Sequence, residues 1–212
     1  MDSEFRLRGL IVCLPEASID DYVGVIETLI QEGLSIFALP AAAEAFTEVL
    51  GIFGPRADFG AYRVSAPEEV AAVARAGARF VFTDVHTPAL VEAAAANGLP
   101  VHAAAMTPSE VRAVLQQGVA GALIWPADVV GHALGNRLAE VGLADRSIAF
   151  GGIGAYAAGE WLKSGSPAVC VDSTLLGDAF AGGSLVQLRD RCGSFVAIQD
   201  KHAPAADGSA GR

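Results

Sequence analysis

The stretch AGARFVFTDVHTPALVEAAAANGLPVHAAAMTPSEVRAVLQQG (residues 76–118) contains two consecutive copies of one sequence pattern. Each copy has a short apolar run, a Thr-Pro pair, a segment rich in Ala, Val and Leu, and a closing glycine. The apolar runs are typical of buried strands, and the segments between them have the helical period. Thr87 and Thr107 are suited to cap the helices, and Gly98 and Gly118 to end them. The stretch therefore predicts strand, helix, strand and helix.

The same unit extends along the chain in both directions. Ser65 is expected to cap a helix that begins with Pro67, and Gly33 and Gly77 are expected to end helices. The apolar runs lie at residues 10–14, 35–39, 59–62, 80–83, 101–104, 122–125, 148–150 and 169–171. Strands that alternate with helices and are buried on both faces pair in parallel. Eight such units predict a single-domain α/β protein with a (β/α)₈ TIM barrel, and a doubly wound open sheet is the alternative.

Composition narrows the classes of partner. The chain has 212 residues, is 52% hydrophobic and has a formal net charge of -10, which argues against nucleic acid and against an anionic membrane surface. No apolar run is long enough to span a bilayer. Three scattered cysteines predict a reducing cytoplasm rather than a disulfide framework. Residues 1–199 are expected to form the barrel domain, and residues 200–212 a disordered tail.

Both architectures place a ligand site at the carboxyl ends of the strands. This rule selects one group of side chains and turns as candidates. They are Glu16, Pro40, Tyr62, Arg63, Asp84, His86, Met106, Trp125, Asp128, Gly151, Gly152, Asp172 and Ser173.

Local patterns in barrel order resemble a known enzyme family. AGARFVFT at 76–83 is similar to an A-G-A-x-F strand entry, ALIWPAD at 122–128 to K-F-F-P-A, and AFGGIGAYAAGEWLKSGSPAVCVDS at 149–173 to a P-T-G-G-I strand and its successor. On these patterns the chain resembles the 2-keto-3-deoxy-6-phosphogluconate (KDPG) and 4-hydroxy-2-oxoglutarate (KHG) aldolases from about residue 9 to residue 188. The resemblance implies aldol cleavage through a lysine iminium, a proton-transferring glutamate, a phosphate held by backbone N–H groups, and a homotrimer.

The residues that this chemistry needs are replaced. By the resemblance, the lysine position falls on Leu123 and the glutamate position on Ala38. The chain's lysines are Lys163, expected late in a helix, and Lys201, expected in the tail. Where the family shows Gly-Gly-Ser after the last strand, this chain has Asp172, whose carboxylate would repel a phosphate.

Several candidates remain for binding or chemistry, each with a plain alternative. Gly151 and Gly152 form either an anion site or only a tight strand-to-helix turn. Arg63 is either the counter-charge of a carboxylate or phosphate, or a loop arginine that is solvated or paired with an acid.

Asp84 and His86 are either an acid/base pair or a helix cap beside a locally bonded imidazole. Tyr62 and Trp125 either stack on a ligand or close the top of the core, and Ser173 is a further ligand-binding candidate. Cys13 is expected to be a small buried core residue rather than a reactive thiol, and Met106 a packing residue. Glu16 is either a base or a solvated charge on a loop.

These observations support two hypotheses about function. The first is a divergent, non-catalytic relative that binds a small ligand, for which a carboxylate or a phosphate is the candidate, and needs no cofactor. The second is a carbon–carbon lyase that cleaves a 2-keto acid without an iminium. One such route is a bound divalent metal together with the Asp84/His86 pair. A metal site could be built from Asp84, His86, Asp128 and Asp172, although no ligand spacing on one element supports it.

An assembly protein is a third class. Its contact would be a helix face with Val70, Val73 or Val111, unless those residues face the strands.

Overall fold

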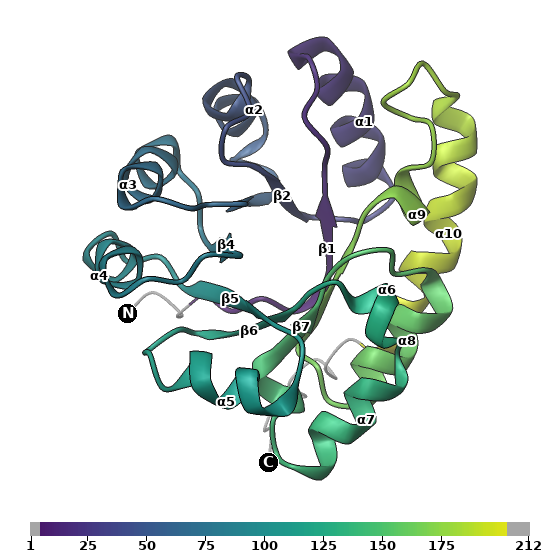
Figure 1. The fold of residues 1–212 in the computed structure, drawn as a ribbon. Helices are drawn as coiled ribbons and strands as arrows, with labels where there is room; N and C mark the ends of the chain where they lie inside the picture. Colours follow the sequence, from purple (N-terminus) through teal and green to yellow (C-terminus); the bar gives the residue numbers. More distant parts are fainter. Residues whose placement is uncertain (1–4, 203–212) are drawn as a thin grey trace, which may run out of the picture.

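A computed structural model describes residues 5–202 of the chain. Eight parallel strands pair in chain order, and β8 pairs with β1 to close a barrel (Figure 1). The closed sheet confirms the predicted TIM barrel and excludes the doubly wound open sheet. The strands are β1 Gly9–Cys13, β2 Ile36–Pro40, β3 Asp58–Tyr62, β4 Val81–Thr83, β5 Val101–Ala105, β6 Gly121–Ile124, β7 Ser147–Ala149 and β8 Ala168–Val171.

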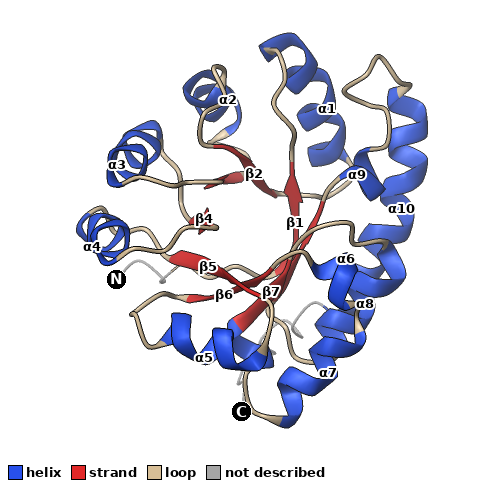
Figure 2. Ribbon diagram, viewed as in Figure 1, coloured by secondary structure: helices blue, strands red, loops and turns tan. Residues whose placement is uncertain are grey.

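Helices surround the sheet on its outer side (Figure 2). They are α1 Ile19–Gln31, α2 Phe46–Phe53, α3 Pro67–Ala76, α4 Pro88–Ala96, α5 Pro108–Leu115, α6 Ala127–Val130, α7 Ala133–Glu140, η1 Ala144–Arg146, α8 Ala155–Lys163, α9 Ser173–Leu176 and α10 Leu185–His202. The last helix continues past the predicted domain boundary at residue 199, so Lys201 lies in a helix and not in a tail. Residues 203–212, the rest of the predicted tail, lie outside the described residues.

The helix boundaries follow the predicted caps with one correction. The Thr87 hydroxyl accepts the Leu90 N–H at 3.3 Å, and the Thr107 hydroxyl accepts the Glu110 N–H at 3.3 Å. The glycines expected to end helices at residues 33, 77, 98 and 118 all have positive φ. Ser65 does not cap α3, because the N-cap position is one residue later. Instead, the Ser65 N–H donates to the Glu69 carboxylate at 2.7 Å.

Strand residues divide between two apolar cores. Leu10 and Val12 pack outward among helix residues, whereas Ile11 and Cys13 belong to a smaller cluster inside the barrel. The same alternation on each strand follows from the two-residue period of a β-strand. Inside the barrel, Gly60 leaves space for the Phe80 ring, into which a Cβ atom at residue 60 would project.

The apolar helix faces are used inside the molecule. Val70, Val73 and Val111 are 0%, 3% and 0% exposed and belong to the core between helices and sheet. The idea that this face supplies a subunit contact is therefore wrong. None of the helices between residues 5 and 202 combines the length and apolar composition that crossing a membrane requires.

Candidate functional site

Two cavities open at the carboxyl end of the barrel, where the prediction placed the site. The first, of about 160 Å³, is lined by Tyr62, Arg63, Phe82, Thr83, Asp84, Ala104, Leu123, Trp125 and Phe150. The second, of about 320 Å³, is lined by Cys13, Pro15, Tyr62, Arg63, Phe150, Asp172, Ser173, Leu176, Gly177 and Phe180. Because both cavities share Tyr62, Arg63 and Phe150, we treat them as two halves of one mouth.

Tyr62 forms the wall between the two halves. Its side chain is buried, its hydroxyl donates to the Leu14 carbonyl at 2.8 Å, and its ring meets the Phe150 ring edge-on with centroids 5.8 Å apart. Burial raises the pKa of the Tyr62 phenol well above its ordinary value. The phenol is therefore a neutral, fixed part of the wall, which agrees with the interpretation that it closes the top of the core.

Arg63 is the cation that both halves share. Its backbone has φ 57°, a left-handed conformation that costs a residue with a Cβ atom about 1 kcal/mol or more. Its guanidinium carbon lies 5.5 Å from the centre of the Tyr62 ring. No acidic side chain among the described residues forms an ion pair with Arg63, so the acid-paired alternative does not hold. Its donors remain available to an anion in the mouth.

The floor of the first cavity is apolar. Leu123 on β6 is 4% exposed and lines this cavity, and it packs inside the barrel with Phe82 of β4. Ala38 on β2 also faces the interior and is fully buried. Cys13 is buried as expected, although it borders the second cavity. Trp125 is 45% exposed and stands at the rim.

The glycine turn after β7 is already engaged by a carboxylate. Gly151 and Gly152 have φ 104° and 63°, which glycine adopts readily. The Gly152 N–H donates to Asp172 Oδ2 at 3.3 Å, and the Ser173 hydroxyl donates to Asp172 Oδ1 at 3.4 Å. A Cβ atom at Gly152 would lie 2.8 Å from Asp128 Oδ2. Two carboxylates therefore flank the turn, and an incoming phosphate would meet negative charge there.

Asp84 and His86 do not form an acid/base pair in the structure. Asp84 lines the first cavity, whereas His86 lines neither half of the mouth. Over residues 5–202 no hydrogen bond connects the two side chains, and Asp84 is not the helix cap, since Thr87 is. The loop is held by Thr83, whose hydroxyl accepts the Val85 N–H at 3.0 Å. The acid/base hypothesis thus lacks its geometric support in this conformation.

The four residues considered as metal ligands do not converge either. Within the described part of the chain, no three His, Cys, Asp or Glu side chains are grouped closely enough to hold a metal ion. Met106 is half-buried, and Glu16 is exposed as expected.

Sequence reasoning missed Phe150, which belongs to both halves of the mouth. The sequence could have indicated it, because Phe150 is the last apolar residue before Gly151 and residues at the carboxyl ends of barrel strands face the mouth.

Comparisons with known proteins agree with the barrel fold. The family model described as KDPG and KHG aldolase matches residues 1–184. The 2-dehydro-3-deoxy-6-phosphogalactonate aldolase of Escherichia coli (strain K12) is 24% identical over 194 residues, which cover 88% of this chain and 92% of that protein.

Two solved structures share the fold. One, described as a native KDPGal structure, superposes with a TM-score of 0.81 at 23% identity and covers 95% of this chain and 98% of its own. The other is the KDPG aldolase of Legionella pneumophila with pyruvate captured as a covalent carbinolamine. It has a TM-score of 0.74 at 22% identity and covers 91% of this chain and 94% of its own. The chain belongs to the KDPG and KHG aldolase family.

Proposed function

We propose that this chain is a divergent family member that binds a small carboxylate at the barrel mouth without forming an iminium. The observation that carries the proposal is Leu123, an alkyl side chain that lines the first cavity at the position where the resemblance expects the lysine. Ala38, which stands at the expected glutamate position, is likewise unable to move a proton. Without an amine, the carbonyl of a keto acid has no nucleophile with which to form the electron sink of class I aldol cleavage.

The chain's own lysines support the same conclusion, because both lie far from the mouth. Lys163 is the last residue of α8, its side chain is 70% exposed, and its Nζ lies 3.7 Å from Glu160 Oε1. Lys201 is in the last turn of α10. In a barrel of this kind, helices end at the amino-terminal side of the sheet, opposite the mouth.

The charges of the mouth favour a carboxylate over a phosphate. Arg63 supplies a bidentate donor that suits a carboxylate. The Gly152 N–H, which would otherwise receive a phosphate, donates to Asp172. Pyruvate, which the Legionella structure contains, is small enough to serve as the test ligand.

Borohydride trapping tests the absence of the iminium. We expect wild-type protein incubated with pyruvate and borohydride to keep its unmodified mass, because no lysine faces the ligand. Leu123→Lys serves as the positive control, since it restores a primary amine at the cavity floor. Labelling of wild-type protein would contradict the proposal, and peptide mapping would show whether Lys163 or Lys201 is the site.

A binding measurement tests whether the mouth binds a small carboxylate. We expect pyruvate to perturb the Trp125 indole resonance saturably, with inorganic phosphate having a much weaker effect. Arg63→Gln should weaken pyruvate binding by roughly tenfold, as expected for the loss of a charged hydrogen bond. Arg75→Gln, an exposed arginine on α3, is the charge-matched control. Phosphate binding as tight as pyruvate binding, or unchanged affinity in Arg63→Gln, would refute this assignment.

Assembly, location and domain extent complete the proposal. Family resemblance supports a homotrimer, which light scattering can test, and a monomeric mass would count against it. The free cysteines at residues 13, 170 and 192 are consistent with a reducing compartment such as the cytoplasm. Residues 1–199 are proposed as the barrel domain, extended by the end of α10.

A further inference from the structure

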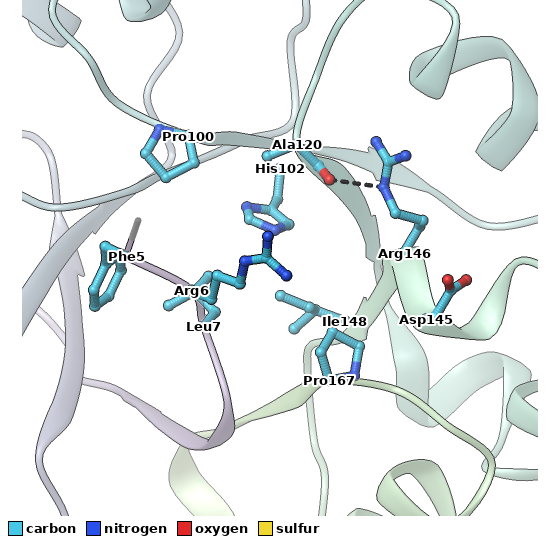
Figure 3. A pocket seen from close by; sticks show the side chains of 10 residues that line it. All are labelled: Phe5, Arg6, Leu7, Pro100, His102, Ala120, Asp145, Arg146, Ile148 and Pro167. Carbon is cyan, nitrogen blue, oxygen red and sulfur yellow. Dashed lines mark hydrogen bonds between the residues drawn. The ribbon is translucent and has the colours of Figure 1, made fainter. Parts of the chain in front are cut away.

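A separate cavity of about 480 Å³, whose lining residues are drawn in Figure 3, lies where the chain enters the strands. This is the amino-terminal end of the barrel, opposite the mouth. Its lining comes from the segments that lead into β1, β5, β6, β7 and β8 and from the first residues of the strands themselves. The lining residues are Phe5, Arg6, Leu7, Pro100, His102, Ala120, Asp145, Arg146, Ile148 and Pro167. None of them borders either half of the mouth.

His102 is the unexplained group in this cavity. It lies on β5, is only 8% exposed, and its Nδ1 is buried without a hydrogen-bond partner. Within the described part of the chain its Nε2 has no partner either. The imidazole ring packs edge-on against the Phe82 ring, with 5.6 Å between the ring centroids. A buried polar group without a partner is costly, and a ligand in the cavity could reach this imidazole at Nε2 but not at Nδ1, which is fully shielded.

The imidazole is neutral at physiological pH. Burial, with a smaller contribution from the charge of Arg146, lowers the pKa of His102 to about 4. The positive charge of the cavity therefore comes from arginine and not from histidine.

Arg146 presents a fixed guanidinium at the rim. Its Nε donates to the Ala120 carbonyl at 3.0 Å and its Nη2 to the Val119 carbonyl at 3.1 Å (Figure 3). Two of its five N–H groups are used in this way, and the remainder can bind an anion. Arg6 and Asp145 are the other charged residues of the lining (Figure 3). The Arg146 guanidinium therefore offers an anion a cationic binding point at this rim, on a chain with a formal net charge of -10.

The rest of the lining is apolar. Leu7 and Ile148 are buried and belong to the core inside the barrel, and two prolines form the sides. Phe5 is stacked on Phe80 with centroids 6.1 Å apart, so its ring is held in place. An apolar floor with a cationic rim suits an anion that carries a flat apolar body.

We propose that this cavity is a second ligand-binding site, for a small aromatic carboxylate, with its carboxylate at Arg146 and its ring between Ile148 and His102. The site is independent of the mouth, because the two share no residue. A molecule bound there would contact the strand ends opposite the mouth, so the barrel would hold two different ligands at once.

Titration with benzoate, followed by imidazole nitrogen–proton NMR spectra, tests the site. We expect the His102 resonances, assigned with His102→Leu, to shift saturably with benzoate. Acetate, which lacks the ring, and benzamide, which lacks the charge, should each shift them much less. Unmoved His102 resonances, equal effects of acetate and benzoate, or benzoate shifts confined to the Trp125 indole at the mouth would each overturn the proposal.

Substitutions test whether the carboxylate of benzoate binds at Arg146. Arg146→Gln should weaken benzoate binding by roughly tenfold or more, and Arg75→Gln, its charge-matched control, should leave it unchanged. Because Arg146 also holds two carbonyls, Ala120→Phe provides a second variant, which fills the cavity while keeping every charge. Wild-type affinity for benzoate in folded Ala120→Phe would refute the site.

Discussion

Replacing His102 by leucine should stabilise the protein, and by more at acidic pH than at neutral pH. The native imidazole is buried, and its Nδ1 has no hydrogen-bond partner among the residues that the structure describes. Leucine has a similar volume and leaves no buried polar atom without a partner. Removal of the buried Nδ1 atom, which has no hydrogen-bond partner in the described part of the chain, should raise the free energy of unfolding at pH 7 by about 1 kcal/mol.

The pH dependence follows from the lowered pKa of His102. Burial reduces this pKa from 6.5 to about 4 in the folded protein. As the pH falls below 6.5, the unfolded chain therefore binds a proton that the folded protein excludes, and wild-type stability falls until the pH reaches about 4. The full loss is about 3 kcal/mol, of which about 2 kcal/mol is present at pH 5. Leucine cannot bind this proton, so the variant avoids the loss.

Urea unfolding of both proteins at pH 7, 6 and 5 measures this effect. The advantage of His102→Leu should grow from about 1 kcal/mol at pH 7 to about 3 kcal/mol at pH 5. Other titrating groups are common to both proteins and cancel in the difference. Phe82→Leu, next to the same ring, is the control, and its effect should not change with pH. A His102→Leu advantage that is the same at all three pH values would refute the reasoning.

Three further substitutions test the mouth. Asp172→Asn removes the carboxylate that accepts the Gly152 N–H, so phosphate affinity should rise severalfold in a calorimetric titration, and an unchanged affinity would show that charge does not exclude the anion. Gly152→Ala should cost about 2 kcal/mol or more in thermal unfolding, because it combines positive φ with a clash, whereas Gly118→Ala, which has positive φ and open space, should cost about 1 kcal/mol. Tyr62→Phe removes the donor to the Leu14 carbonyl and should cost about 1 kcal/mol in urea unfolding, and wild-type stability would mean that this hydrogen bond contributes nothing.

Local patterns were enough to predict the architecture of this protein. Strand length, the Thr-Pro helix starts at residues 87 and 107 and the glycine ends act over a few neighbouring residues, so they can be read without knowing the fold. The wrongly predicted cap at Ser65 also has a local cause. The Glu69 carboxylate accepts the Ser65 and Ala66 N–H groups, and the helix cap lies one residue later than predicted. The absence of lysine near residue 123 was also visible, since it needed only the sequence and the resemblance.

Whether each candidate residue is paired, hydrogen-bonded or buried depends on contacts between distant parts of the chain. The carboxylate of Asp172 reaches a turn that is 20 residues away in sequence. Between residues 5 and 202 no acid forms an ion pair with Arg63, although acids follow several neighbouring strands. In the same range no hydrogen bond joins Asp84 to His86, although the two are close in sequence. The sequence places His102 on the fifth strand without indicating its environment, and only closure of the barrel buries its imidazole. Charge pairing and desolvation depend on distances in space, and only the tertiary structure sets those distances.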